Sequence, residues 1–507
     1  MKNKIMMTGL CALALLSGLA SCGKESASAS AASANESASA APAPTGTIQI
    51  EFWHTSGQGI VTEYERAARD FAALVKENEG VDIVITPKYQ GNYTDIESKI
   101  SSGFSTGNYP TIAIAYPDHV ATYLAKEKSD EQYVINLEKL ANDPEIGFGK
   151  EAYIGDGEAS DFVQAFYDEG KEYAKEGIYS LPLMKSTEVM FYNKTLTDII
   201  VPMYNDEKGL GMDTYEMSHY FDDISWDAFI DFAEYVKDKI KAGAFAGKQG
   251  NKLEIPVFYD SDSNLFITKS YQNDIPFVSI KDGAGSNDFN NDKAKAMVKK
   301  LKKNSDDGIL TTKGVKNIYG SDLFTQEKVL FDIGSSGGAD YNSPQGGGFT
   351  IGVCKVPYDN NKPSYVTQGL TTTLLRTPDD TDGLKYKYGW KFLKYLTSTE
   401  VNLDLALYGS AGYVPVRESC YETDYFKEWV ADAEFLGDVQ KIVREKINGH
   451  YLNTACFSGS SKSREAVGGI IAQAFSNTKA KTEAEINKLI DDLFAEAKNN
   501  ADLAKKV

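Results

Sequence analysis

Two short stretches of the chain match the G-x-S-x-G pattern, in which a sharp turn exposes a nucleophilic serine. They lie at 103–107 and 334–338. A working triad also needs an Asp and a His after the serine, and His450 is the only histidine beyond the second stretch. Two matches in a chain with 43 glycines are weak evidence. We therefore interpret the second stretch as loop backbone and expect no serine nucleophile.

The residue types that bind metals are present but poorly spaced. The four histidines, His54, His119, His219 and His450, are scattered along the chain. No H-E-x-x-H motif occurs. Asp260, Asp262 and Asn264 begin like a calcium-binding EF-hand loop, but Leu265 stands where that loop needs Gly and Tyr271 where it needs Glu. We interpret this polar cluster as a solvated loop, with a position facing a ligand cleft as the alternative, and we expect neither a metal nor a cofactor.

Paired carboxylates are the remaining catalytic chemistry to consider. Glycoside hydrolases use two acidic side chains that have no fixed spacing in sequence, and this chain has 72 acids. A membrane-tethered glycoside hydrolase is therefore an alternative from another class of protein. The formal net charge of −19 argues against nucleic acid as a partner, because binding to phosphates needs clustered Lys and Arg.

The elements that would position such side chains alternate between strands and helices. Residues 47–53 alternate apolar and polar as in a strand, 60–77 have apolar residues at helical spacing, and 81–85 form a second strand. The pattern repeats with a helix at 93–103, a strand at 111–116 and a helix at 118–124. Repeated β-α-β units predict an α/β fold with a parallel sheet covered by helices on both faces.

A second α/β body is predicted farther along the chain. Its helical patterns lie at 226–240, 292–303, 385–396 and 482–498, with a strand-like run at 348–354. The extended runs at 185–192 and 365–375 lie where the helical character changes. We interpret both as crossings between the two bodies.

The N-terminus has the features of an export signal. Lys2 and Lys4 precede a mostly apolar run at 5–20, which is short for a membrane span of roughly 20 residues. The sequence Leu19-Ala20-Ser21-Cys22-Gly23 then resembles the lipobox of bacterial lipoproteins. We predict a signal peptide at 1–21, lipidation of Cys22, and a lipidated tether at 22–46, which is built from small and polar residues. The protein is then extracytoplasmic and anchored to a membrane by lipid.

Three cysteines remain in the mature chain once Cys11 and Cys22 are set aside. They are Cys354, Cys420 and Cys456, so at most one disulfide can form.

A series of motifs, in order along the chain, resembles the family-1 extracellular solute-binding proteins of ABC importers. This group includes the maltose- and glycerol-3-phosphate-binding proteins. The motifs are Phe52-Trp53-His54, Tyr89-Gln90-Gly91-Asn92-Tyr93, Thr106-Gly107-Asn108-Tyr109-Pro110, Leu181-Pro182, Lys185-Ser186-Thr187, Tyr192-Asn193-Lys194, Ser225-Trp226-Asp227, Gly334-Ser335-Ser336-Gly337, Ala411-Gly412-Tyr413-Val414-Pro415 and Ser463-Arg464.

The resemblance implies a two-lobed periplasmic-binding-protein fold of type II, with a multi-strand hinge and a ligand cleft between the lobes. On this basis we predict that residues 47–187 and 329–372 form lobe 1, and that 188–328 and 373–507 form lobe 2. Ligand contacts to both lobes would favour the closed state. The membrane subunits of an ABC transporter would recognise that state, and we expect the binding protein to be a monomer and not an enzyme.

The resemblance to the glycerol-3-phosphate-binding branch also implies a set of ligand-binding residues. Ser335 is the neighbouring alternative to Ser336, and Asp118 stands one residue from the acidic position of that branch. Side chains of these types suit a polyol, whose hydroxyl groups both donate and accept hydrogen bonds. The predicted residues are Tyr93, Asp118, Ser186, Ser336, Gly369, Tyr413 and Arg464.

The predicted function is therefore high-affinity binding of a small polar solute and its delivery to an ABC transporter. A sugar or oligosaccharide is the leading candidate. Glycerol-3-phosphate or a glycerophosphodiester is the alternative, ranked second because Asp118 would repel a nearby phosphate.

Overall fold

The computed structural model describes residues 46–128, 131–344, 347–409 and 412–505. The predicted signal peptide and the lipidation site Cys22 lie outside the described residues, as does all of the predicted tether except Gly46. Within the described ranges, no helix is long and apolar enough to cross a membrane.

The first sheet has five strands in the order β2-β1-β3-β13-β4. Strand β1 is parallel to β2 and to β3, which confirms the predicted β-α-β units. In contrast to the predicted parallel sheet, β13 is antiparallel to both of its neighbours. The strands are β1 (Ile48–His54), β2 (Ile83–Tyr89), β3 (Ile112–Ala115), β4 (Leu181–Ser186) and β13 (Gln368–Leu374).

Helix α1 (Gln58–Glu79) shows how the sequence builds this lobe. Its buried side chains recur every three or four residues, so one face packs against the sheet. The helix ends at Gly80, whose φ of 72° suits the left-handed cap that glycine adopts without strain. Helix α2 (Tyr93–Thr106) begins with a capping box in which Asn92 and Asp95 satisfy each other's backbone N–H groups.

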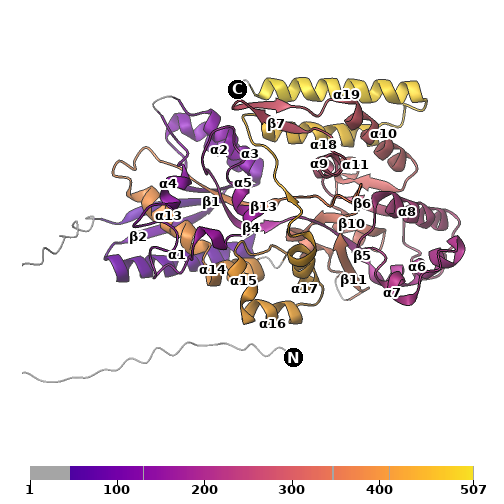
Figure 1. Ribbon diagram of the computed structural model, residues 1–507, viewed down its shortest axis with the longest axis horizontal. Coiled ribbons are helices and arrows are strands. Elements are labelled where there is room, and N and C mark those ends of the chain that lie inside the picture. Colours follow the sequence, from indigo (N-terminus) through magenta and orange to yellow (C-terminus); the bar gives the residue numbers. More distant parts are fainter. Residues whose placement is uncertain (1–45, 129–130, 345–346, 410–411, 506–507) are drawn as a thin grey trace, which may run out of the picture. The chain divides into compact units, whose positions relative to one another are not determined.

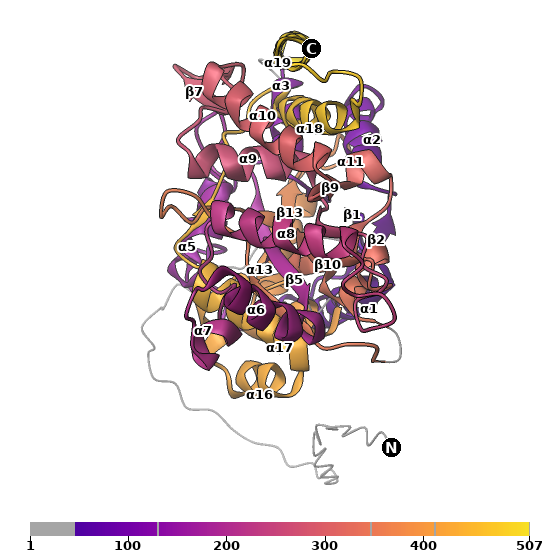
Figure 2. The ribbon, with the colours of Figure 1, turned by 90° about the vertical axis from the view of Figure 1, so that its right-hand side faces the viewer.

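The second sheet has the order β11-β5-β10-β6-β9. Strand β10 is parallel to β6 and antiparallel to β5, while β6 and β9 are parallel. In Figure 2, helices α6 (Lys194–Lys208) and α8 (Trp226–Lys241) lie in front of this sheet. The strands are β5 (Glu188–Asn193), β6 (Ile255–Tyr259), β9 (Leu310–Thr312), β10 (Val329–Ser335) and β11 (Ile351–Lys355).

Strand pairing differs from the predicted division of the chain in two places. Residues 329–372 were assigned to lobe 1, but β10 and β11 pair with β5 in the second sheet. Residues 373–507 were assigned to lobe 2, but α13 (Leu384–Leu396) packs against β1 and β13 of the first sheet. Pairing between strands far apart in sequence decides which sheet each segment joins. The local sequence pattern of a segment does not indicate its partner strand. The lobe boundaries themselves stay a prediction.

Two further pairs of strands and the remaining helices complete the described chain (Figure 1). Helices α18 (Ser460–Ser476) and α19 (Glu483–Ala504) pack against each other, and α18 also packs on α9 (Asp262–Gln272). The strand pairs are β7 (Val278–Lys281) with β8 (Ala284–Asn287), and β12 (Tyr365–Val366) with β14 (Tyr451–Leu452). The other helices are α3 (Pro117–Ala125), α4 (Leu137–Ala141), η1 (Ala159–Asp161), α5 (Gln164–Glu169), α7 (Thr214–Ser218), α9 (Asp262–Gln272), α10 (Asp292–Asp306), α11 (Lys313–Lys316), α12 (Gly320–Phe324), η2 (Ser336–Asn342), α14 (Thr399–Asp404), η3 (Leu405–Gly409), α15 (Glu418–Glu422), α16 (Asp424–Asp432), α17 (Glu434–Lys441), η4 (Ile442–Ile447), α18 (Ser460–Ser476) and α19 (Glu483–Ala504).

The chain passes between the two sheets over very short distances. Only Thr187 separates β4 of the first sheet from β5 of the second, as the extended run at 185–192 predicted. The Thr187 hydroxyl donates to the carbonyl of Val366 at 3.0 Å, and the backbone N–H of Thr367 donates to the carbonyl of Leu452 at 3.0 Å. The crossing segments are thus tied to one another by hydrogen bonds.

Aromatic side chains fill the core beside each sheet. On the first sheet, Phe71 packs against Phe392 with ring centroids 5.4 Å apart. On the second, Phe229 packs edge-on against Phe331 at 4.9 Å. The three cysteines of the described chain are buried and form no disulfide: Cys354, Cys420 and Cys456.

Candidate ligand-binding site

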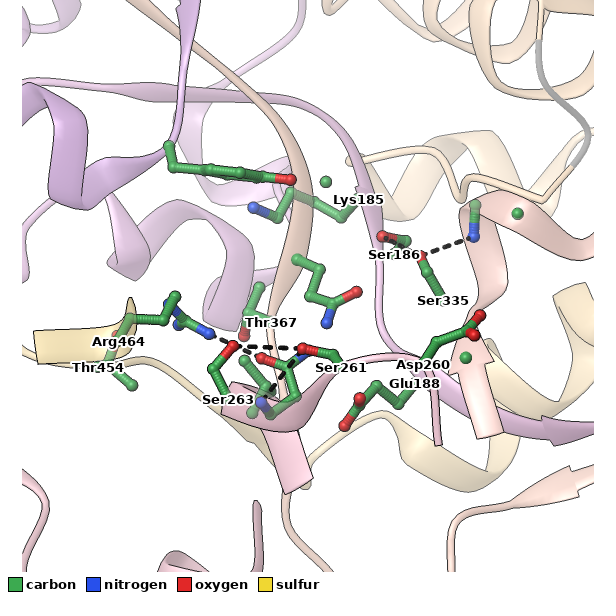
Figure 3. Close-up of a pocket in the computed structure, with 18 of the residues that line it drawn as sticks. Lys185, Ser186, Glu188, Asp260, Ser261, Ser263, Ser335, Thr367, Thr454 and Arg464 are labelled. Atoms are coloured by element: carbon green, nitrogen blue, oxygen red, sulfur yellow. Dashed lines mark hydrogen bonds between the residues drawn. The ribbon is translucent and has the colours of Figure 1, made fainter. Parts of the chain in front are cut away.

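A cavity of about 530 Å³ lies between side chains carried by both sheets (Figure 3). Its lining combines carboxylates, hydroxyl groups, amides, three cations and tyrosine rings. A cavity of this size and composition suits a small polar molecule.

The first sheet brings its polar residues to the cavity because of strand direction. The chain leaving the carboxyl end of β3 carries Tyr116 and Asp118. Strand β13 runs antiparallel to β3, so its first residues, Gln368 and Gly369, lie at the same edge. Strand β4 is antiparallel to β13 and places its last residue, Ser186, opposite Gln368.

The second sheet contributes by the same logic. Asp260 directly follows β6 and Lys313 directly follows β9, and these parallel strands end at one edge of the sheet. Ser335 ends β10, and the antiparallel strand β5 places its first residue, Glu188, opposite Ser335. Ligands of α/β proteins bind at such carboxyl edges of parallel strands.

Five of the seven predicted ligand-binding residues line the cavity. They are Asp118, Ser186, Gly369, Tyr413 and Arg464.

Tyr93 and Ser336 are not among the lining residues. The Tyr93 ring stacks on the Tyr116 ring, with centroids 3.9 Å apart, so Tyr93 lies behind a residue that does line the cavity. The Ser336 backbone N–H donates to the carbonyl of Thr187 at 2.8 Å, and Ser335 lines the cavity in its place. Their roles in ligand binding stay a prediction.

Gly369 occupies a backbone conformation that side chains rarely adopt. Its φ is 104°, and a Cβ atom at this position would lie 2.6 Å from the carbonyl oxygen of Met184. The close approach of β13 to β4 therefore requires glycine here.

Arg464 is held by two polar groups from different elements. Its Nη1 donates to Asn264 Oδ1 at 2.7 Å, and its Nε lies 3.8 Å from Asp118 Oδ2. Asn264 is on α9 and Asp118 is on α3, so the guanidinium links residues positioned by the two sheets. In the view of Figure 3, Arg464 and Thr454 lie at the opposite end of the cavity from Asp260 and Ser335.

Lys185 and Glu169 form a buried ion pair in the cavity wall. Lys185 Nζ lies 2.5 Å from Glu169 Oε2, and both side chains are more than nine-tenths buried. Lys185 Nζ also donates to the hydroxyl of Thr371 at 3.3 Å. Each charge therefore neutralises the other.

Glu188 and Asp260 are acids held by hydrogen bonds, with no ion pair of this kind among the described residues. The hydroxyl of Tyr259 donates to Glu188 Oε2 at 2.7 Å, and the hydroxyl of Thr268 donates to it at 3.3 Å. Burial raises the pKa of Glu188 to about 7, although Tyr259, Asn264 and Thr268 favour the ionised form. Burial also raises the pKa of Asp260 to about 6, although the backbone N–H of Gly320 donates to its Oδ1 at 2.7 Å.

Tyrosine rings supply apolar surface next to these polar groups. Tyr116, Tyr319 and Tyr413 line the cavity. A Cβ atom at Gly337 would lie 2.9 Å from the Tyr413 ring, so glycine lets this ring pack flat on the loop after β10. Ring faces of this kind suit the apolar face of a sugar.

Several lining residues were missed by sequence reasoning. The preferred interpretation of Asp260 and Asn264 as a solvated loop is wrong, because both line the cavity, as the alternative of a cleft-facing cluster predicts. Asp262 instead begins α9 and accepts from the hydroxyl of Thr312 at 2.5 Å. Glu188 had no signal of its own. The second G-x-S-x-G stretch contributes Gly334, Ser335, Gly337 and Gly338 to the cavity wall. Within the described ranges, no group of three or more His, Cys, Asp or Glu side chains could hold a metal ion.

Comparison with known proteins decides the family. Residues 66–434 match the family model described as bacterial extracellular solute-binding protein. The chain belongs to this family.

Other solute-binding proteins resemble it along most of their length. The sn-glycerol-3-phosphate-binding periplasmic protein UgpB of Salmonella typhimurium is 24% identical over 382 residues, which are 74% of this chain and 75% of that protein. Among solved structures, UgpB of Mycobacterium tuberculosis in complex with glycerophosphocholine has a TM-score of 0.64 at 12% identity, covering 90% of this chain and 99% of that one. The cyclic alpha-maltosyl-1,6-maltose binding protein of Arthrobacter globiformis has a TM-score of 0.62 at 16% identity, covering 91% and 100%. These likenesses show the fold, which is that of the two-lobed solute-binding proteins.

Proposed function

We propose that the protein binds a small polar solute, a sugar or oligosaccharide, outside the cytoplasmic membrane and delivers it to an ABC transporter. Binding involves no chemical step. The protein acts as a monomer, and a lipid on Cys22 tethers it to the membrane surface. Membership in the solute-binding family and the names of its relatives support this proposal.

The observation that carries the proposal is the cavity lined from both sheets. Hydroxyl, amide and carboxylate groups converge there beside tyrosine rings. Each neutral hydrogen bond contributes only about 0.5–1.5 kcal/mol to affinity. Tight binding therefore needs several of them at once, and a ligand that contacts both walls would favour closure of the two lobes.

We propose that the five lining residues among those predicted contact the ligand directly. Tyr93 would support the Tyr116 ring from behind, and Ser336 would hold the crossing at Thr187 in place. The ligand contacts are Asp118, Ser186, Gly369, Tyr413 and Arg464.

The direct test is titration calorimetry of the mature protein against a panel of neutral sugars. The panel would include maltose, maltotriose and cyclic maltosyl-maltose. Small-angle scattering with each sugar that binds would follow lobe closure as a smaller radius of gyration. Failure of every sugar to bind would contradict the leading proposal.

Glycerol-3-phosphate or a glycerophosphodiester is the second candidate. The relatives named for sn-glycerol-3-phosphate and the solved complex with glycerophosphocholine favour it. Titration with these two phosphate esters in the same experiment separates the candidates.

A glycoside hydrolase is the alternative from another class of protein, because the cavity contains several carboxylates that could act as a catalytic pair. Incubation with oligosaccharides followed by an assay for new reducing ends would reveal hydrolysis. The lipid anchor has its own test, because Cys22→Ala should move the protein from the membrane fraction to the soluble fraction.

A further inference from the structure

Two buried carboxylate oxygens in the cavity wall have no hydrogen-bond partner among the described residues. They are Glu188 Oε1 and Asp118 Oδ1. Glu188 stands at the start of β5 on the second sheet, and Asp118 stands on α3 beside the first. Both residues line the cavity, so its wall contains two buried acceptors that lack a donor in the described part of the chain, although His119 Nε2 lies 4.0 Å from Asp118 Oδ1.

The environment of Glu188 fixes its carboxylate in place. The residue is only 1% exposed, and the hydroxyls of Tyr259 and Thr268 both donate to Oε2. These bonds occupy Oε2, and the Asn264 amide also favours the ionised form. Oε1 is buried too and has no hydrogen-bond partner among the described residues. A buried acceptor without a donor costs about 1–3 kcal/mol. A ligand that donates a hydrogen to Oε1 removes that cost.

The three cations that line the cavity already have partners. Lys185 is paired with Glu169, and Arg464 contacts Asn264 and Asp118. Lys313 Nζ lies 3.5 Å from the centroid of the Tyr319 ring. A phosphate would have to compete with these partners for the three cations. It would also lie next to the acidic side chains of Glu188 and Asp260 in the cavity wall.

We propose that Glu188 is a specificity-determining residue that accepts a hydrogen bond from a hydroxyl of a neutral polyol through Oε1. Asp118 Oδ1 accepts a second hydroxyl on the opposite side, so the ligand bridges the two sheets as a donor. Phosphate esters are disfavoured, because their phosphate group adds negative charge and further acceptor oxygens to a wall that contains Asp118, Glu188 and Asp260. This inference rests on the proposed function and narrows it to uncharged ligands.

The variant Glu188→Gln tests the proposal by replacing the acceptor Oε1 with a hydrogen-bond donor. The amide oxygen would take the place of Oε2, where Tyr259 and Thr268 donate, and the amide NH₂ would replace the free acceptor Oε1. Calorimetry would compare wild type and variant against the neutral sugars, sn-glycerol-3-phosphate and glycerophosphocholine. We expect the affinity ratio of the best-bound sugar to the best-bound phosphate ester to fall by roughly tenfold or more, which corresponds to loss of one charge-assisted hydrogen bond.

Asp260→Asn is the matched control for charge. It removes one negative charge from the same wall, at a side chain whose Oδ1 is already bonded to the Gly320 N–H. We expect a clearly smaller change in the sugar-to-phosphate ratio than for Glu188→Gln. Equal changes in the two variants would mean that net charge alone sets selectivity, and this would overturn the assignment of Glu188.

Glu188→Asp provides a second variant if the glutamine variant does not fold. It keeps the charge but withdraws the acceptor by one methylene, so sugar affinity should fall without a gain for the phosphate esters. Unchanged sugar affinity in both Glu188 variants would overturn this inference and leave the proposed function standing. Tighter binding of a phosphate ester than of any sugar by the wild type would also overturn it and would favour the second candidate function. Binding of no compound would overturn the proposed function together with this inference.

Discussion

The guanidinium of Arg464 lies beside the carboxylate of Asp118 in the cavity wall, with Nε 3.8 Å from Oδ2. Arg464 is on α18, which packs on α9 beside the second sheet and also contacts α3, the helix after β3 of the first sheet that carries Asp118. The contact therefore joins groups carried by elements beside different sheets. A ligand that binds either group would also change this contact.

Arg464→Ala should weaken ligand binding with little effect on folding. The side chain is 29% exposed, and ion pairs at such positions contribute about 0–1 kcal/mol to stability. Loss of its charge-assisted hydrogen bonds to a ligand should lower affinity by roughly 10- to 100-fold. Calorimetry with the best-bound sugar measures the affinity, and thermal unfolding without ligand should shift by no more than about 2 °C.

Arg444→Ala is the matched control for Arg464→Ala. Arg444 is 25% exposed and pairs with Glu418, and it is not among the residues that line the cavity. Its removal should change thermal stability by a similar small amount and leave ligand affinity as in the wild type. Equal affinity of wild type and Arg464→Ala would remove Arg464 from the site.

Gly369→Ala should destabilise the protein strongly. The new methyl group would meet the Met184 carbonyl at 2.6 Å, in a backbone conformation that already disfavours side chains. We expect the free energy of unfolding to fall by about 2–5 kcal/mol, from left-handed strain and overpacking together. Denaturant unfolding measures this change.

Gly80→Ala separates the two causes. Gly80 also has a positive φ, 72°, but no atom lies within 4 Å of the added methyl group. This variant should lose only the backbone contribution, about 1–2 kcal/mol. Equal losses at the two positions would contradict the close approach of β13 to β4.

Ionisation of Glu188 should lower the stability of the folded protein and raise its affinity for sugar as pH increases. Burial raises its pKa in the folded protein to about 7, above the ordinary value of 4.5. The stability contribution of this group is therefore fully present below about pH 4.5 and is lost as pH rises through 7. The ionised form is the better acceptor, so sugar affinity should instead rise between pH 6 and pH 8.

Glu188→Gln should reduce both dependences. The charged and titratable groups that influence Glu188 are Tyr259 and Arg464, and the variant keeps both. Thermal unfolding of the ligand-free protein and calorimetry at pH 6, 7 and 8 test the two signs separately. Parallel pH profiles of wild type and variant would contradict the role of Glu188 in either measurement.

Asp332→Asn should stabilise the protein at neutral and alkaline pH. Asp332 is fully buried, and neither carboxylate oxygen has a hydrogen-bond partner among the described residues. Burial and the nearby charge of Asp260 raise the pKa of Asp332 well above its ordinary value, so ionisation opposes folding. The variant should gain about 1–3 kcal/mol at pH 8. The same measurement repeated at lower pH is the control, because the gain should shrink as the wild-type carboxyl becomes protonated. An equal gain at every pH would contradict ionisation as the cause.

The sequence predicted the local elements of the fold well. The sequence predicted α1 and the strands on either side of it. Their apolar residues recur at helical spacing in α1 and at alternating positions in the strands. The run at 185–192 was recognised as a crossing, and it became β4 and β5. Strand partners were less accessible. Strand β10 joins β5 and β6 from far along the chain, and no feature of its own residues indicates which sheet it enters.

The candidate site was predicted in part for the same reason. Residues in recognisable motifs, such as Ser186 and Arg464, line the cavity. Glu188 enters it only because β5 pairs with β10 in a register that sets Glu188 opposite Ser335. Asp260 resembled a solvated residue because polar residues after a strand usually lie in surface loops. A burial pattern created by tertiary pairing cannot be read from those residues alone.

The single residue between β4 and β5 has a mechanical consequence. Ser186 and Glu188 flank Thr187, so two polar groups of the site sit next to the pivot about which the sheets would swing. Residues close to the pivot move least when the sheets rotate. Asp118 and Arg464 lie on separate helices and would move farther for the same rotation. A solute could therefore dock first against the nearly stationary pair, and the distant groups would arrive as the protein shuts.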